Sequence, residues 1–324
     1  MSQFTDSRSQ PGKKGAAGTN DRELFLTEFG ELVIQSQEET MNYDAMRYIR
    51  RITQGKADDF PIIGRKRDAS EHEPGEVILG GTVEHNARTI TVDKVIYDAV
   101  FVAEIDELLN HFDLMAPYAK QVGQSLGSIQ DRRVAIMHIL ASRETTLAPQ
   151  GQPLPAYYYA ADLKTNGAKL EDWASLSRQY HLENDISGEK PKMMLPHAQH
   201  LLLARYSGIE GGPVTTGSGN RSSGTVGQVM GLSIEGTNHI PNTNITTGNS
   251  KYQGDFSTTV GHVGTKMAVG SLELRAMKMV MKDVPERLGT LIIGSQVNGH
   301  GVLRPECSIE GRTDVIGGRA ALNA

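Results

Sequence analysis

The stretch "GKADDFPIIGRKRD", residues 55–68, places the apolar run "FPII" between two acids and three bases. The residues that follow, to about 103, are rich in Val, Ile and Thr, alternate in "RTITVD" as a strand does, and carry the turn signal "EPGE" at 73–76. This pattern predicts two strands that leave a body, turn and return as a long ribbon. Because a two-stranded ribbon alone in water is marginally stable, it needs another surface, which its own domain need not supply.

The charges of this ribbon are segregated along its length. Bases follow the apolar run near the root, and acids lie toward the tip. Both sets are candidates for contacts with the missing surface, as are three arginines of the upstream segment "AMRYIRRITQG". For those arginines a solvated face or ordinary salt bridges are the commoner interpretation. The candidate contact residues are Arg47, Arg50, Arg51, Arg65, Lys66, Arg67, Asp68, Glu71, Glu73 and Glu76.

The composition is that of an ordinary globular protein. Hydrophobic residues make up 38% of the 324 residues, and the net charge of −5 is too small to indicate a nucleic-acid reader. No run approaches the roughly 18 apolar residues of a membrane span, and the N-terminus lacks the apolar core of a secretory signal. The single cysteine, Cys307, excludes an internal disulfide and fits a reducing cytoplasm.

The rest of the chain predicts an α+β body with a second lobe. Residues 21–55 predict an amphipathic helix and a connector, and apolar positions including Leu126 and Ile129 predict a helix of about 43 Å from Leu114 to Ser142. Two shorter helices, in "KLEDWASLSRQYH" and "HAQHLLLARYSG", alternate with strands and Gly-rich loops. The segments "KMAVGSLELRAMKMVMKD" and "GTLIIGSQVNGHGVLRPE" predict strands that return to the first body.

Motifs associated with catalysis or ligand binding are incomplete. The loop "GGPVTTGSGN" has P-loop spacing at Gly212 and Gly217, but Ser218 stands where a lysine is required. His197 and His200 lack a third metal ligand nearby, and the single cysteine has no evident histidine and acid partners. We therefore expect no catalytic, metal or cofactor-binding site and no cofactor. An enzyme with a site at the Gly-rich loops is the alternative from another class.

Six pieces of the sequence, taken in order, resemble the major capsid proteins of T7-like short-tailed phages of the autographivirus type. The pieces are "FLTEFGELV", "RYIRRITQGKADDFPIIGR", "EPGE", "RTITVDKVIYDAVFVAEIDELLNHFDL", "VMGLSIE" and "GHGVLRPE". The similarity spans about residues 24–143 and 226–306 and is weak between 145 and 195. No one piece suffices, but "FPIIGR", "LNHFD" and "GHGVLRPE" in this order make the match specific.

The resemblance implies an α+β subunit with the HK97-like capsid fold. Its parts are an N-terminal arm (1–55), an extended E-loop hairpin (56–93), a P domain with a long spine helix (94–159), an A domain (160–265), and P-domain return strands with the C-terminus (266–324). In this fold the E-loop lies across a neighbouring subunit. The ribbon would find its missing surface there, with "FPIIG" closing its root on its own body and its acids meeting bases of the neighbour such as Arg47, Arg50, Arg51 or Arg65.

The implied function is that of a major capsid protein, with no enzymatic activity. Copies would form hexamers and pentamers in an icosahedral shell, of T=7 lattice in the family, around the double-stranded DNA of a short-tailed phage. The implied partners are other copies, a scaffolding protein during assembly, a portal protein at one vertex, and packaged DNA on the inner face without sequence specificity; no membrane is expected. The protein would be located in the virion capsid after assembly in the host bacterial cytoplasm. A cellular encapsulin-like shell protein is the nearest alternative.

Two devices found in related shells are not expected here. Some shells cross-link a loop lysine to an asparagine of a neighbour, but Lys66, near the root, is the only lysine between 62 and 92. Others carry a long N-terminal scaffolding segment, whereas only about twenty residues precede the first amphipathic helix. We therefore expect no cross-link and a separate scaffolding protein.

Overall fold

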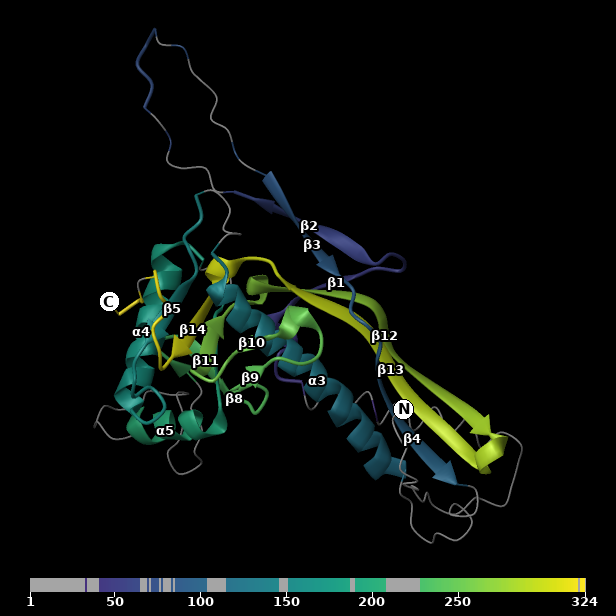
Figure 1. Cartoon of the computed structure of the whole chain (residues 1–324). Coiled ribbons are helices and arrows are strands. Elements are labelled where there is room, and N and C mark those ends of the chain that lie inside the picture. The colour runs from purple at the N-terminus through teal and green to yellow at the C-terminus, as the bar shows by residue number, and fades with distance from the viewer. Residues whose placement is uncertain are drawn as a thin grey trace.

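The main elements of the described part of the chain are two sheets, a long helix that contacts both, and a projecting ribbon (Figure 1). The computed structural model describes residues 33, 41–64, 69, 71–75, 77, 83, 85–103, 115–145, 151–186, 190–207, 228–319 and 321–323. Outside these residues lie the predicted N-terminal helix apart from Val33, and the Gly-rich loop at 211–225.

The long helix predicted at 114–142 is confirmed as α3, Met115–Arg143. Its N-terminal half buries Val122 and Leu126 against the four-stranded sheet, and its C-terminal half buries residues such as Val134 and Ile139 near the six-stranded sheet. The predicted apolar stripe was wrong at Ile129, which is 39% exposed. The helix is therefore the common support for both sheets.

The four-stranded sheet contains the predicted return strands. Its order is β1 (Tyr48–Arg51), β12 (Val269–Val284), β13 (Gly289–Val302) and β4 (Ile96–Ala103), with β1 parallel to β12 and the other pairs antiparallel. Helix α3 covers one face, where Gly294 leaves room for Val122 and Leu126. Residues 48–51 were expected in a connector, but they pair with β12 and form a strand.

The six-stranded sheet forms the second lobe with two helices, α4 (Gly167–Glu183) and α5 (His197–Ser207). Its order is β5 (Ala156–Tyr159), β14 (Ser308–Arg312), β11 (Thr259–Gly264), β6 (Lys192–Leu195), β8 (Leu232–Gly236) and β7 (Gln228–Val229). The Trp173 ring of α4 lies on β14 at Gly311, where an added Cβ would stand only 2.7 Å from the ring. This close packing requires glycine at that position.

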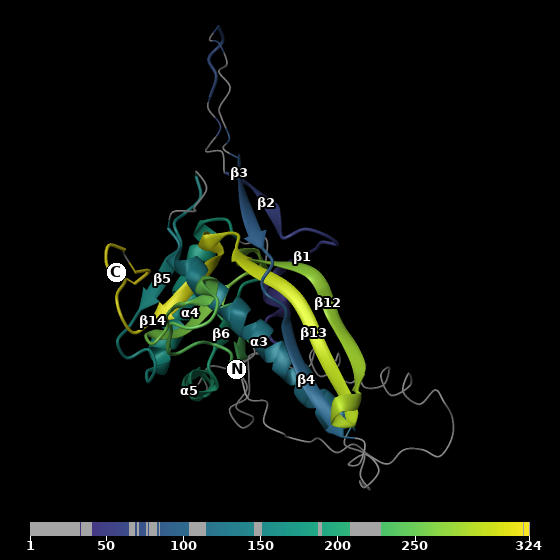
Figure 2. The ribbon, with the colours of Figure 1, turned by 45° about the vertical axis from the view of Figure 1, so that its right-hand side comes forward.

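The ribbon begins as the antiparallel pair β2 (Ala57–Ile63) and β3 (His85–Thr91). It leaves the body at the end opposite the β12–β13 turn (Figure 2). The shorter elements are β9 (Asn244–Ile245), β10 (Gly254–Asp255) and the 3-10 helices η1 (Asp44–Met46), η2 (Ser250–Tyr252), η3 (Lys266–Ala268), η4 (Pro285–Arg287) and η5 (Pro305–Cys307).

Candidate functional site

The root of the ribbon is closed by apolar packing on its own body. Phe60 of β2 and Ile90 of β3 are buried in one cluster with Leu272 and Leu303. Gly270 of β12 lies directly under Ile90, whose Cδ1 would be 2.6 Å from an added Cβ. The prediction that "FPIIG" seals the root against its own body is confirmed.

Ionic contacts fix both strands of the root. Arg50 of β1 forms an ion pair with Asp58 at 3.0 Å, and its guanidinium lies 5.0 Å from the centre of the Phe60 ring. Where the ribbon returns, Asp93 accepts hydrogen bonds from Lys251 and from the Tyr252 hydroxyl. These contacts fix the direction in which the ribbon leaves the body.

The other two upstream arginines share one acid of β12. Arg47 Nη1 lies 3.2 Å from Glu273 Oε1, and Arg51 Nε lies 3.2 Å from Glu273 Oε2. Arg47 also pairs with Asp44 at 2.6 Å, and only 4% of its side chain is exposed. The Arg51 side chain is 80% exposed. All three upstream arginines thus form salt bridges within the chain, and a role between subunits stays a prediction for them.

The candidate contact residues of the ribbon are only partly described. Glu71 and Glu73 are exposed. The remaining candidates, Arg65, Lys66, Arg67, Asp68 and Glu76, lie outside the described residues. The structure therefore places two of the tip acids on the surface.

A second surface was missed by the sequence reasoning. The face of the four-stranded sheet opposite α3, here called the outer sheet face, carries apolar residues across three strands and lysines along β12. Tyr97 is 65% exposed and Val280 is 41% exposed. The alternation of β4 and β13 signals a two-faced sheet, but the sequence does not say which face the helix covers. The outer sheet face comprises Tyr97, Ala99, Phe101, Lys278, Val280, Lys282, Leu291, Ile293 and Ser295.

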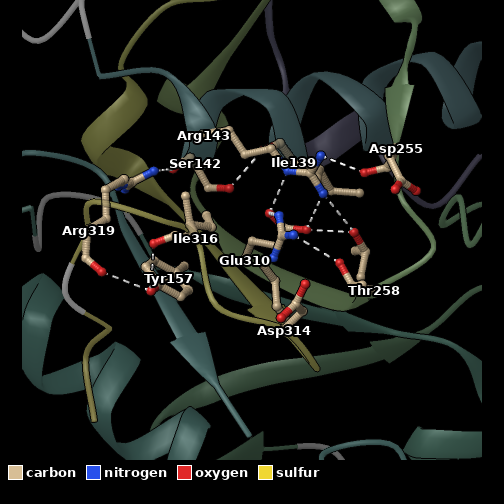
Figure 3. Close-up of polar contacts among 12 residues, drawn as sticks. Ile139, Ser142, Arg143, Tyr157, Asp255, Thr258, Glu310, Asp314, Ile316 and Arg319 are labelled. Atoms are coloured by element: carbon tan, nitrogen blue, oxygen red, sulfur yellow. Dashed lines mark hydrogen bonds and ion pairs between the residues drawn. The ribbon is translucent and has the colours of Figure 1, made fainter. Parts of the chain in front are cut away.

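A buried charge cluster joins α3 to the six-stranded sheet (Figure 3). Glu310 of β14 has no exposed side-chain surface and accepts two hydrogen bonds from Arg143, at 2.6 and 2.8 Å. Arg319, in the C-terminal segment, donates to the Ser142 carbonyl at 2.9 Å, and its own carbonyl accepts from Tyr157 at 3.0 Å. The cluster ties the end of α3, the sheet and the C-terminal segment together.

The described residues contain no group of three or more His, Cys, Asp and Glu side chains able to hold a metal ion. Within the same part of the chain, no helix is long and apolar enough to cross a membrane. His197 and His200 lie beside Gly236, where an added Cβ would stand 2.8 Å from His197 Nδ1. This pair packs against β8.

Two solved phage capsids share this arrangement of elements. The capsid of cyanophage P-SCSP1u superposes with a TM-score of 0.75 at 27% identity, covering 84% of this chain and 88% of that chain. The mature capsid of bacteriophage PhiM1 superposes with a TM-score of 0.70 at 16% identity, covering 84% and 86%. The fold is therefore that of the HK97-like phage capsid proteins, and the α+β fold class predicted from the sequence is confirmed.

The family follows from the sequence comparison. Residues 59–311 match the family model of the Gp10A-like major capsid proteins. The major capsid protein of Escherichia phage T7 is 24% identical over 327 residues, which cover 91% of this chain and 93% of the T7 protein. The chain belongs to the Gp10A-like family of phage major capsid proteins. Its function is to build a capsid shell from many copies, and the encapsulin-like alternative is not favoured.

Proposed function

We propose that the ribbon, residues 56–93, crosses to a neighbouring copy and that copies join in this way as hexamers and pentamers of an icosahedral T=7 shell. The observation that carries this is a root buried on its own body while Glu71 and Glu73, farther along, are exposed. The buried root fixes the direction in which the ribbon leaves the body. The exposed residues farther along the ribbon are then free to contact another copy. Closure of a shell multiplies weak contacts of this kind.

The outer sheet face is complementary in charge to the acids of a neighbour's ribbon. It is largely apolar across β4 and β13, and Lys278 and Lys282 lie four residues apart on the same face of β12, with Val280 between them. Glu71 and Glu73 are two residues apart, which in an extended chain places them on one side. The acids of one copy are therefore complementary in charge to the lysines of the next.

These lysines are better partners for the acids than the upstream arginines. Arg47 is buried between Asp44 and Glu273, and Arg50 is paired with Asp58. Engaging a neighbour would require these arginines to give up contacts within the chain. The side chains of the two lysines are exposed instead.

Charge reversal tests this arrangement. We expect Glu71→Lys with Glu73→Lys to abolish megadalton particles, Lys278→Glu with Lys282→Glu to do the same, and the four changes together to restore them. Each exposed pair contributes only about 0–1 kcal/mol, so the loss arises from repetition over the shell. Size-exclusion chromatography and negative-stain microscopy of the purified full chain measure it.

The matched control reverses two exposed lysines of the second lobe, Lys169→Glu with Lys190→Glu, which changes the net charge by the same amount. This variant is expected to form particles. Normal particles from either ribbon or sheet variant, or no recovery in the fourfold variant, would show that the ribbon does not use these lysines.

The remaining parts of the proposal follow from the family and from the charge. The parts of the subunit are the arm (1–55), the E-loop (56–93), the P domain (94–159 and 266–324) and the A domain (160–265). A separate scaffolding protein acts during assembly in the host cytoplasm, a portal protein occupies one vertex, and the chain has no enzymatic activity. The net charge of −5 suits a container for DNA, because a strongly basic lining would bind the genome tightly and resist its movement. A dense basic patch on the inner face of an assembled particle would contradict this.

A further inference from the structure

Three aromatic rings from three separate elements form a buried stack. His138 of α3 and His262 of β11 are stacked with centroids 4.9 Å apart and planes 17° apart. Tyr43, which precedes η1, stacks on His262 at 5.5 Å and 24° and lies tilted against His138 at 6.3 Å. All three side chains are fully buried. The stack therefore joins residues 41–47 to the long helix and to the six-stranded sheet.

The polar atoms of this stack have almost no partners. His138 Nε2 donates to the Met46 carbonyl at 2.8 Å, which leaves the proton on that nitrogen. His138 Nδ1, both nitrogens of His262 and the Tyr43 hydroxyl have no hydrogen-bond partner among the described residues. A second proton on either histidine would add a charge and an N–H group with no acceptor. The geometry thus requires both rings to be neutral.

Charged groups around the stack do not compensate a charged ring. Asp131 of α3 accepts from the Asn42 amide at 2.7 Å, and Glu235 of β8 is held by Lys192 of β6 at 2.6 Å. Residues 41–47 place the Arg47–Asp44 ion pair near the stack, and η5 places the buried thiol of Cys307 there. Burial lowers the pKa of His262, and the neighbouring His138 lowers it further.

We propose that this ring stack is a pH-sensitive latch that holds residues 41–47 on the body at neutral pH and releases them in acid. Release exposes both histidines to water, where each can take up its second proton. Residues 41–47 are the part of the N-terminal arm (1–55) directly before β1, so the latch controls how the arm is attached to the body. The inference is independent of where the ribbon of a neighbour lies.

The sign of the effect follows from the three groups that opening exposes. Burial lowers the pKa of His138 to about 4 and that of His262 well below its usual value. The open state therefore binds more protons below about pH 6.5, and each histidine raises the opening constant by up to about tenfold per pH unit. Burial raises the pKa of Asp131 to about 6, which opposes opening by up to about tenfold per unit between that pH and about 3.8. The net expectation is about a tenfold rise per pH unit below pH 6.

Hydrogen exchange of the full-length chain, read by mass spectrometry and corrected for the intrinsic exchange rate, measures the opening. We expect protection of residues 42–47 to fall about tenfold per pH unit between pH 6 and 4.5, while β13 residues 289–296 keep theirs. In His262→Phe, an apolar ring replaces one whose nitrogens make no hydrogen bond. The two remaining groups then oppose each other, and protection of 42–47 should become nearly independent of pH below 6.

The control is His239→Phe, which removes a histidine of lowered pKa that lies outside the stack. It is expected to keep the wild-type profile. Three results would overturn the latch: protection of 42–47 retained to pH 4.5, simultaneous loss at 42–47 and 289–296, or a His262→Phe profile identical to wild type. The first two are read on the wild-type chain, so they decide the matter even where His262→Phe fails to fold.

Discussion

Replacing Glu310 by alanine is expected to lower the free energy of unfolding by about 3–5 kcal/mol, because it removes a fully buried carboxylate and leaves two partly buried arginines without it. Glu310 has no exposed side-chain surface, and Arg143 binds both of its oxygens. Arg312 approaches the same carboxylate at 3.4 Å, and the Thr259 hydroxyl donates to it at 2.5 Å. Chemical denaturation of the full-length subunit measures the loss.

The control for this experiment is Asp58→Ala, which breaks an ion pair of similar length on the surface. Arg50 and Asp58 are 3.0 Å apart, but both side chains are partly exposed to solvent. Water replaces the lost partner there, so the expected cost is about 0–1 kcal/mol. A cost for Glu310→Ala as small as that of Asp58→Ala would show that the buried cluster does not stabilise the junction between helix and sheet.

Much of the architecture was predictable because local patterns of apolar and polar residues indicate it. Repeated apolar spacing defined α3 to within one residue at each end, and alternation placed the strands β12 and β13. The apolar run beginning at Phe60 was distinctive enough to predict a closed root. The order of the motifs then identified the fold, since each is weak alone.

The contacts of the candidate site were less predictable because they join residues far apart in the sequence. Arg47 and Arg51 meet Glu273 across more than two hundred residues, and no local pattern signals that pairing. Strand β1 was missed for the same reason, since its partner is β12. The outer sheet face is defined by where α3 lies, which alternation alone leaves open.

Replacing Phe60 by alanine is expected to detach the ribbon root from the body and to abolish shell formation. Phe60 is buried with Ile90 and Leu272, and Tyr48 meets its ring edge-on at 6.2 Å. Truncation of a buried phenylalanine costs about 3–5 kcal/mol. Because β2 and β3 pair only with each other among the described strands, no further ladder holds the ribbon once this packing is lost.

The loss should be local, since the cluster at Phe60 is separate from the cores of the two sheets. We expect faster hydrogen exchange at residues 85–91 of β3, unchanged protection at residues 289–296 of β13, and no megadalton particles by size-exclusion chromatography. The control is Ile63→Ala in the same strand, where the side chain is exposed and β3 should stay protected. Normal particles from Phe60→Ala would mean that a ribbon with a loosened root still reaches its neighbour, and the sealed root would then be no requirement for assembly.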